Sequence, residues 1–268
     1  MDGTRELEGK AAVVFGGSTG IGRASAIRLA QGGARVVVAA RRPGPVEETV
    51  AAIGIAGGKA VGVAADASDA EDVKHVIEQA VESFGGVDIL VNSQGIQRYG
   101  TVEDTDEELW DEVMNVNVKS MFLTAKYAIP EMRKRGGGAI VNVGSVQGLA
   151  TQTRVAAYST SKAANISLTR TIAVDYAHEG IRANIVLPAS IDTPLLRYGA
   201  EMFRGERDQD ELIADWGRMH PIGRVGTPEE VAELVAFLAG PRASFITGAE
   251  IKIDGGMMAA LGVSLPES

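Results

Sequence analysis

Cysteine is absent from the 268 residues of this chain, and histidine occurs at three positions. The lack of cysteine excludes disulfide bonds and thiolate metal sites and fits a reducing compartment, so we expect a cytoplasmic protein. His75, His178 and His220 show no spacing typical of metal ligands. No metal site is therefore expected.

Long apolar runs and an excess of basic charge are missing as well. No segment approaches the roughly 18 apolar residues of a membrane-spanning helix, and the first six residues are too polar for a signal peptide. The formal net charge of −9 would repel nucleic-acid phosphates. We therefore expect a soluble globular protein with neither a membrane nor a nucleic acid as partner.

Short apolar segments rich in valine and isoleucine alternate with helical segments. The apolar segments are residues 10–16, 34–40, 59–65, 87–92, 138–145, 181–187 and 248–253. The helical segments include residues 21–31, 46–55, 69–84, 106–135 and 156–178. Apolar strands joined by helical crossovers are typical of a parallel sheet covered on both faces. The pattern predicts one α/β domain over residues 1–268, with a doubly wound, Rossmann-type sheet of about seven strands.

This alternation is interrupted at residues 194–226. The segment contains a charged run, residues 204–211, flanked by Met202, Phe203, Trp216 and Met219. An insertion of this length in a compact domain is either a functional lid or a disordered loop. The apolar residues favour a substrate lid, because they give the segment a face with which to close.

A glycine-rich turn follows the first apolar segment and precedes the first helix. Glycines allow backbone N–H groups to approach a pyrophosphate, and the N-terminus of the following helix adds its positive dipole end. Such a string alone is weak evidence in a chain with 33 glycines, but its position is that of a dinucleotide site. A plain tight turn is the alternative. The predicted cofactor-binding residues are Gly16, Ser18, Thr19, Gly20, Ile21 and Gly22.

The second apolar segment ends in Ala39-Ala40-Arg41-Arg42. A carboxylate at this place usually binds the adenosine ribose of NAD, whereas a basic residue accommodates the additional phosphate of NADP. Arg41 can meet a phosphate with several donors, and Arg42 can add a second contact. The sequence thus favours NADP(H), without excluding NAD(H), and two solvated arginines are the alternative.

Tyr158 and Lys162 lie four residues apart, with Ser145 thirteen positions before Tyr158. On a helix this spacing places a phenol and an ammonium group on one face. A phenol has a pKa of about 10, and a nearby cation can lower it towards neutrality. The pair predicts an acid–base centre, although such a spacing also arises by chance on helix surfaces.

With these features in their expected places, the chain resembles the short-chain dehydrogenase/reductase family over residues 10–256. The resemblance implies a catalytic tetrad of Asn117, Ser145, Tyr158 and Lys162. The further cofactor contacts that it implies are Asp66, Ala67, Asn92, Gly95, Tyr158, Lys162, Pro188, Ile191 and Thr193.

The family resemblance also implies the reaction, which is hydride transfer between a nicotinamide and a secondary alcohol or the matching carbonyl compound. Tyr158 would exchange the proton of the substrate oxygen, and Ser145 would hold that oxygen. Lys162 would favour the phenolate and bind the nicotinamide ribose. Asn117 would position a water that passes protons from Lys162 to solvent.

Polar residues flank the implied tetrad, and they suggest the kind of small molecule that binds. The predicted substrate residues are Gln94, Gln97, Gln147, Gln152 and Arg154. Pockets place polar groups where a ligand has polar atoms, because an unpaired buried amide costs about 1–3 kcal/mol. A compact hydroxylated substrate, such as a sugar or polyol, is the expectation.

Two alternatives remain open. A 3-oxoacyl-[acyl-carrier-protein] reductase would have to dock an acidic carrier, and the basic residues 126 and 133–135 offer a local cluster in an otherwise acidic chain. A catalytically idle NADP-binding sensor or assembly subunit would be expected to have lost a member of the tetrad, but all four are present.

Assembly is a further expectation from the resemblance. Family members are usually homotetramers that pair the long helices, here residues 106–135 and 156–178. Four apolar residues after the last strand could cover a neighbouring subunit or form a loose tail. They are Met257, Met258, Leu261 and Val263.

Overall fold

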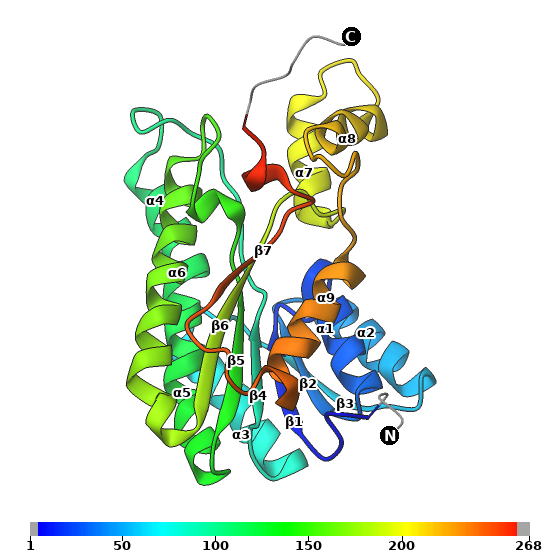
Figure 1. The fold of residues 1–268 in the computed structure, drawn as a ribbon, viewed down its shortest axis with the longest axis vertical. Helices are drawn as coiled ribbons and strands as arrows, with labels where there is room; N and C mark the ends of the chain where they lie inside the picture. The colour runs from blue at the N-terminus through cyan, green and yellow to red at the C-terminus, as the bar shows by residue number, and fades with distance from the viewer. Residues whose placement is uncertain (1–4, 262–268) are drawn as a thin grey trace.

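The computed structural model describes residues 5–261, which form a parallel sheet between two layers of helices (Figure 1). The strands are β1 (Ala11–Phe15), β2 (Arg35–Ala40), β3 (Lys59–Ala64), β4 (Ile89–Asn92), β5 (Gly138–Val143), β6 (Ile181–Pro188) and β7 (Glu250–Ile253). The main helices are α1 (Gly20–Gln31), α2 (Pro43–Ile55), α3 (Ala70–Phe84), α4 (Glu107–Met114), α5 (Ser120–Lys134), α6 (Ala156–Tyr176), α7 (Pro194–Phe203), α8 (Gln209–Arg218) and α9 (Pro228–Ala239). Shorter turns are the π-helix η1 (Asn115–Lys119) and the 3-10 helices η2 (Val146–Gly148), η3 (Ala177–Glu179), η4 (Pro241–Ala243) and η5 (Met257–Ala259).

The sheet confirms the predicted fold class. Its strand order is β3-β2-β1-β4-β5-β6-β7, and every neighbouring pair is parallel. The first connection steps outward from β1 on one side, and the chain then returns to add β4 on the other side. The carboxyl ends of β1 and β4 therefore lie side by side at the switch point where such sheets bind ligands.

Both faces of the sheet are buried, as the near-continuous apolar strands predict. Along β1, Ala12 and Val14 point to one core, which α1, α2 and α9 complete. Val13 and Phe15 point to the other core, which α3, α5 and α6 cover. Successive side chains of a strand face opposite sides, so a strand between two helix layers needs apolar residues at every position.

Local sequence signals set the limits of several helices. Asp69 precedes α3, and its carboxylate accepts hydrogen bonds from the backbone N–H groups of Glu71 and Asp72. Gly85 ends the same helix with a φ of 82°, a conformation that glycine adopts at little cost. Thr227 and Glu230 form a capping box at the start of α9. These caps satisfy backbone groups that a helix end leaves free.

The interrupted segment 194–226 is largely helical. It forms α7 and α8, which stand above the carboxyl ends of the strands in Figure 1. Ala200, Leu212 and Ile213 form a small apolar cluster between the two helices, and the Asp208 carboxylate caps α8. A disordered loop, the alternative left by the sequence, does not describe this segment.

Candidate active site

A cavity of about 1080 Å³ extends across the carboxyl ends of the strands, from Arg41 at one end to α7 and α8 at the other. Most residues predicted to bind the cofactor lie on its wall. They are Gly16, Ser18, Thr19, Gly20, Ile21, Arg41, Arg42, Asp66, Ala67, Gly95, Tyr158, Lys162, Pro188, Ile191 and Thr193. Residues far apart in the sequence thus meet in one continuous groove.

The glycine turn has the geometry that a pyrophosphate requires. Gly16 has a φ of 72°, and a Cβ placed on it would lie 2.6 Å from the backbone nitrogen of Gln94. Thr19 precedes α1, and its side chain makes no capping hydrogen bond. The backbone N–H groups at the start of α1 are therefore not blocked by a side-chain cap and can face an anion. The turn fits the phosphates of a dinucleotide.

Gly22 and Asn92 do not line the cavity but support its wall. A Cβ on Gly22 would lie 2.1 Å from the carbonyl oxygen of Gly16, so only glycine lets α1 pack onto the turn. The buried Asn92 amide donates to Asn142 Oδ1 at 2.9 Å and accepts from Thr124 Oγ1 at 2.8 Å. These partners satisfy the Asn92 side chain inside the sheet.

Arg41 and Arg42 lie on the wall at the end of β2, beside Ala39 and Ala40. Asp66, the nearby acidic residue on this wall, accepts hydrogen bonds from the backbone N–H of Ser68 at 2.9 Å and from its hydroxyl at 2.7 Å. This end of the cavity can therefore offer guanidinium donors to an additional phosphate.

Tyr158 and Lys162 come from the first turns of α6 and are buried, each with 5% of its surface exposed. The Lys162 Nζ atom lies 5.5 Å from the centroid of the Tyr158 ring and donates to the Val143 carbonyl at 3.4 Å. Ser145, at the end of β5, accepts a hydrogen bond from the Gln147 backbone N–H at 3.1 Å. The spacing in the sequence has thus brought a phenol, an ammonium and a hydroxyl group to one place.

Burial dominates the protonation of the pair. It raises the pKa of Tyr158 to about 12, an effect that the Ser145 hydroxyl partly offsets. Burial also lowers the pKa of Lys162 to about 8. Loss of hydration disfavours the charged form of each group. In the protein alone the pKa of Tyr158 is therefore raised, opposite to the direction expected from its neighbour Lys162, because loss of hydration is the largest cause of the shift.

Asn117 lies in η1, a single π-helical turn between α4 and α5, where the sequence pattern predicts one uninterrupted helix. Its Oδ1 accepts from the Ile96 backbone N–H at 2.8 Å, and its Nδ2 donates to the Ile96 carbonyl at 2.9 Å and to Ser161 Oγ at 3.0 Å. The amide therefore holds the loop after β4 against α6, beside Lys162. The role in proton transfer remains a prediction.

The end of the cavity below α7 and α8 has both polar and apolar walls. All five predicted substrate residues, Gln94, Gln97, Gln147, Gln152 and Arg154, line it. Tyr99, which no sequence pattern indicated, also lines it, and its ring lies edge-on to Phe203 at 4.7 Å between centroids. Other apolar lining residues are Leu195, Leu196, Leu212, Trp216 and Met219. The cavity thus suits a molecule with a polar edge and an apolar body.

Met257 and Met258 also line this cavity, within their own chain. The sequence suggested that they cover a neighbouring subunit or form a loose tail, and the structure places them elsewhere because η5 folds back after β7. Leu261 is exposed, and Val263 lies outside the described residues. The signal that could have placed the two methionines is their position directly after Asp254-Gly255-Gly256, where the last strand reaches the cavity.

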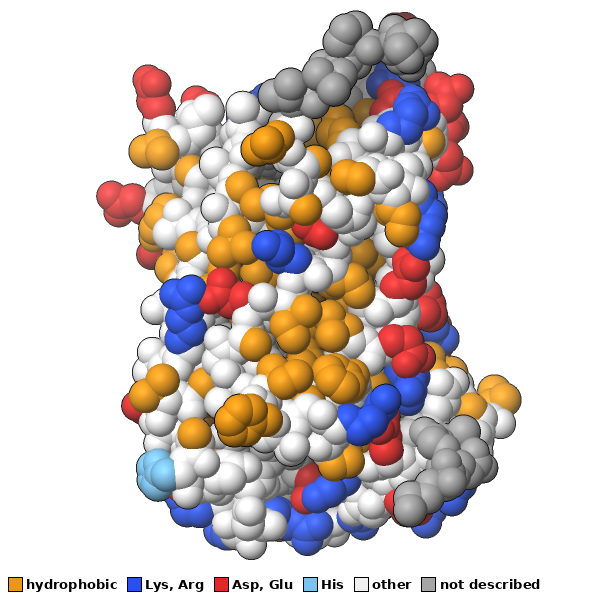
Figure 2. Space-filling view, in the orientation of Figure 1, with side chains coloured by type: hydrophobic (Ala, Val, Ile, Leu, Met, Phe, Trp, Pro, Cys, Tyr) orange, Lys and Arg blue, Asp and Glu red, His pale blue; other side chains and the backbone are white. Residues whose placement is uncertain are grey.

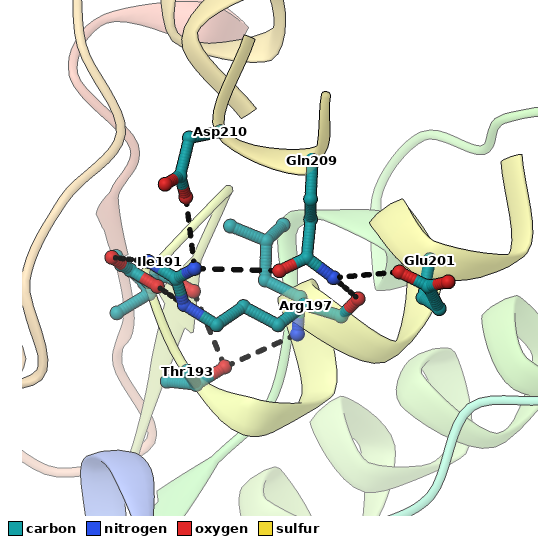
Figure 3. A network of polar contacts seen from close by, with 8 residues as sticks. Ile191, Thr193, Arg197, Glu201, Gln209 and Asp210 are labelled. Carbon is teal, nitrogen blue, oxygen red and sulfur yellow. Dashed lines mark hydrogen bonds and ion pairs between the residues drawn. The ribbon is translucent and has the colours of Figure 1, made fainter. Parts of the chain in front are cut away.

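Arg197 on α7 connects the start of α8 to the loop that follows β6 (Figure 3). Its guanidinium donates to both Asp192 carboxylate oxygens, at 2.7 and 2.8 Å, and to Asp210 Oδ1 at 2.9 Å. The Gln209 amide donates to the Arg197 carbonyl at 3.1 Å. The two carboxylates raise the pKa of Arg197. This network connects the start of α8 to the segment that follows β6.

His220 makes a second connection between these segments. It is 3% exposed, its Nε2 accepts from the Ser190 backbone N–H at 3.3 Å, and its Nδ1 lies 3.0 Å from the Trp216 carbonyl. These partners require a proton on Nδ1 and a lone pair on Nε2. The ring therefore joins the end of α8 to the loop after β6.

Replacing His220 with leucine should raise the substrate KM by about 10-fold, because unpaired buried partners cost about 1–3 kcal/mol. His220→Gln, which retains an acceptor for the Ser190 N–H, should recover most of the loss. Steady-state kinetics on both variants check this. His178→Leu, at an exposed site on η3, is the control, and an equal KM in wild type and His220→Leu would contradict the connection.

Comparisons with known proteins agree with this geometry. A family model described as enoyl-(acyl carrier protein) reductase matches residues 16–258. A 2-(S)-hydroxypropyl-CoM dehydrogenase of Xanthobacter autotrophicus is 38% identical over 96% of this chain and 99% of its own. A cyclohexanol dehydrogenase of an Acinetobacter species is 37% identical over 94% of this chain and 96% of its own. The ligand-free aldohexose dehydrogenase of Thermoplasma acidophilum superposes with a TM-score of 0.91 at 38% identity, covering 99% of this chain and all of that one.

The chain therefore belongs to the short-chain dehydrogenase/reductase family of oxidoreductases, whose members generally bind NAD(H) or NADP(H). Within residues 5–261 no helix has the length and apolar character to cross a membrane. The same residues contain no group of three or more histidine or acidic side chains able to hold a metal ion.

Proposed function

We propose that this protein is an NADP(H)-dependent oxidoreductase that interconverts a secondary alcohol and the corresponding carbonyl compound. The observation that carries this proposal is the burial of Tyr158, Lys162 and Ser145 on the wall of a cavity that continues to the glycine turn and to Arg41. A proton donor and a dinucleotide site in one groove are what the reaction needs.

Each residue of the site has a task that its chemistry can perform. The bound nicotinamide supplies or accepts the hydride. Tyr158 gives a proton to the substrate oxygen in reduction and takes it in oxidation, while the Ser145 hydroxyl hydrogen-bonds that oxygen as its charge changes. Lys162 stabilises the phenolate and binds the nicotinamide ribose. Asn117 holds the loop beside Lys162 and positions the water through which protons reach solvent.

The preference for NADP rests on the end of β2. Arg41 and Arg42 line the cavity, and no carboxylate occupies the tip of that strand. A guanidinium group can bind a phosphate with two parallel hydrogen bonds, whereas NAD recognition normally uses an acidic residue here. NAD would bind through the remaining contacts, but with fewer favourable charges.

The proposed substrate is a compact secondary alcohol with further polar groups, in the range of sugars and polyols. The glutamine side chains on the wall can hydrogen-bond hydroxyl groups. The similarity to an aldohexose dehydrogenase supports hydroxylated substrates, and the similarity to a cyclohexanol dehydrogenase fits the apolar wall. Segment 194–226, with α7 and α8, would act as the lid that closes over this molecule.

A 3-oxoacyl-[acyl-carrier-protein] reductase activity has less support. Three members of the basic cluster that would dock the carrier are paired within the chain. Arg133 pairs with Glu179, Lys134 with Glu131 and Arg135 with Asp88. Paired charges attract an acidic partner weakly. An idle sensor is also less favoured, because all four tetrad side chains are present and three of them line the cavity.

The proposed enzyme is a homotetramer located in the cytoplasm. Phe122 on α5 is 47% exposed and Val174 on α6 is 79% exposed, although both are apolar. Figure 2 shows further apolar side chains gathered along the middle of the face on which the edge strand β7 lies. Light scattering on the purified protein tests the assembly.

The proposed function is tested by a panel of secondary alcohols, sugars, ketones and 3-oxoacyl thioesters, assayed with each cofactor by absorbance of the reduced nicotinamide. Turnover of alcohols and ketones, faster with NADP(H) than with NAD(H), is the expected result. Faster turnover of carrier-linked thioesters would favour the acyl reductase. No turnover of any compound would favour the idle protein.

The pH dependence follows from the direction of the Tyr158 shift. Because its pKa is raised to about 12, the phenol keeps its proton near neutrality and can donate it during reduction. Oxidation requires the phenolate, so its kcat should rise from about pH 7 to about pH 10. Profiles of kcat in both directions check this. An oxidation rate that falls over this range would contradict the assignment of Tyr158 as the base.

A further inference from the structure

Three arginines line the cavity: Arg41, Arg42 and Arg154. None of them forms an ion pair with a carboxylate of residues 5–261. The arginines of α7, of α8 and of the loops beside them are paired, namely Arg197 with Asp192, Arg204 with Glu201, Arg207 and Arg218 with Asp215, and Arg224 with Glu230. Arg41 and Arg42 are explained by the additional phosphate of NADP. Arg154 lines the part of the cavity where the substrate would bind, and no acidic partner has yet been assigned to it.

The backbone of Arg154 is held in an unusual conformation. Its φ is 62°, and among the described residues other than glycine it is alone in having a positive value. The Gly100 N–H donates to the Arg154 carbonyl at 2.8 Å, and the Gly100 carbonyl accepts from the Ala156 N–H at 3.2 Å. A positive φ is costly for a residue other than glycine and persists where the surroundings hold it, often at a binding site. Gly100 thus holds Arg154 just before α6.

The charges on the cavity wall point to an anionic ligand. The charged lining residues are Arg41, Arg42, Asp66, Arg154 and Lys162. Asp66 follows β3 and lies at the same end of the cavity as Arg41, where the adenosine would bind. Among the described residues, the end of the cavity below α7 and α8 is therefore lined by two cationic side chains, Arg154 and Lys162, and by no carboxylate. In a chain with a net charge of −9, such a local excess of positive charge attracts a negative group.

We propose that Arg154 is a specificity-determining residue that binds a carboxylate of the substrate, which is accordingly a secondary hydroxy acid or the matching oxo acid. A single guanidinium matches the charge and the planar shape of one carboxylate, with two parallel hydrogen bonds. The apolar residues Phe203, Trp216 and Met258 would contact the carbon skeleton. This assignment rests on the proposed alcohol–carbonyl reaction and narrows its substrates to acids.

The test compares hydroxy acids that have alicyclic or aromatic skeletons with their own methyl esters, which differ mainly in the charge. A hydrogen bond to a charged group contributes about 1.5–3 kcal/mol, so the wild-type kcat/KM should be about 10-fold to 100-fold higher for the acid. Arg154→Asn removes the charge, and asparagine tolerates a positive φ. In that variant the acid and the ester should be used about equally, through a higher KM for the acid.

Arg98→Gln is the matched control, since it also removes one arginine charge, from a residue that does not line the cavity and is paired with Glu112. It should keep the preference for acids. Arg154→Gly, which relieves the backbone strain, should lose the preference as Arg154→Asn does. An equal loss of activity towards acid and ester in both Arg154 variants would overturn the assignment, because a purely structural role predicts it.

Two other results would also overturn the carboxylate site. In the first, the wild-type enzyme uses the esters as efficiently as the acids. In the second, it prefers phosphate or sulfonate analogues to carboxylates. Either result would leave the proposed reaction intact, because alcohols would still be oxidised. Failure of every alcohol and ketone with both cofactors would instead overturn the proposed function, and the Arg154 assignment with it.

Discussion

Tyr158→Phe is expected to lower turnover in both directions by about 10²-fold to 10⁴-fold, because it removes the proton donor and acceptor of the substrate oxygen. The ring remains, so the tightly packed start of α6 should keep its shape. Buried phenylalanine has no polar atom that needs a partner, which limits the effect on folding. The loss should therefore appear in kcat, measured with the best alcohol and ketone of the panel.

The control is a variant that makes the same chemical change elsewhere on α6. Tyr176→Phe removes a hydroxyl group from a residue that does not line the cavity, and it should leave turnover unchanged. Binding of NADPH to Tyr158→Phe, followed by fluorescence, should stay within a few-fold of wild type. Near-normal turnover in Tyr158→Phe would remove Tyr158 from the reaction.

Arg41→Ser should lower kcat/KM for NADP by about 10-fold to 100-fold, because a hydrogen-bonded charge pair with the phosphate contributes about 1.5–3 kcal/mol. The value for NAD should change little, since NAD has no phosphate at that position. Kinetics with both cofactors at low salt give the ratio. Low salt matters because screening weakens interactions between exposed charges.

Arg23→Ser is the control for the cofactor variant. Arg23 lies exposed on α1 and does not line the cavity, so its loss should leave the ratio of NADP to NAD use unchanged. The reciprocal change, Ala40→Asp, places a carboxylate at the tip of β2 and should favour NAD. Equal effects of Arg41→Ser on the two cofactors would contradict a phosphate contact.

The repeating elements of the fold could be predicted because their signals are local. All seven apolar segments became strands within a few residues of the expected limits. A strand buried on both faces needs apolar residues at every position, and that requirement is visible without knowing its neighbours. The glycine turn was equally accessible, since a positive φ and a close backbone approach at Gly16 leave little choice of residue.

The walls of the cavity could be predicted only in part. The glutamines and Arg154 were found because they flank the tetrad in the sequence. No sequence pattern indicated a role for Tyr99, and the sequence suggested a subunit contact or a loose tail for Met257 and Met258. All three line the cavity, because a loop and η5 fold across the ends of the strands. An apolar residue in a loop carries no periodic signal that tells a cavity wall from a subunit interface.

The sequence by itself determined the order of strands and helices and the four-residue spacing of Tyr158 and Lys162. Helix geometry converts that spacing into neighbouring side chains. The tertiary structure decided the protonation of the two groups, because burial removes their hydration, which raises the pKa of Tyr158 to about 12 and lowers that of Lys162 to about 8. It also decided that Arg154 lines the cavity while the arginines around α7 and α8 are paired, since ion pairs depend on which carboxylates the fold brings near.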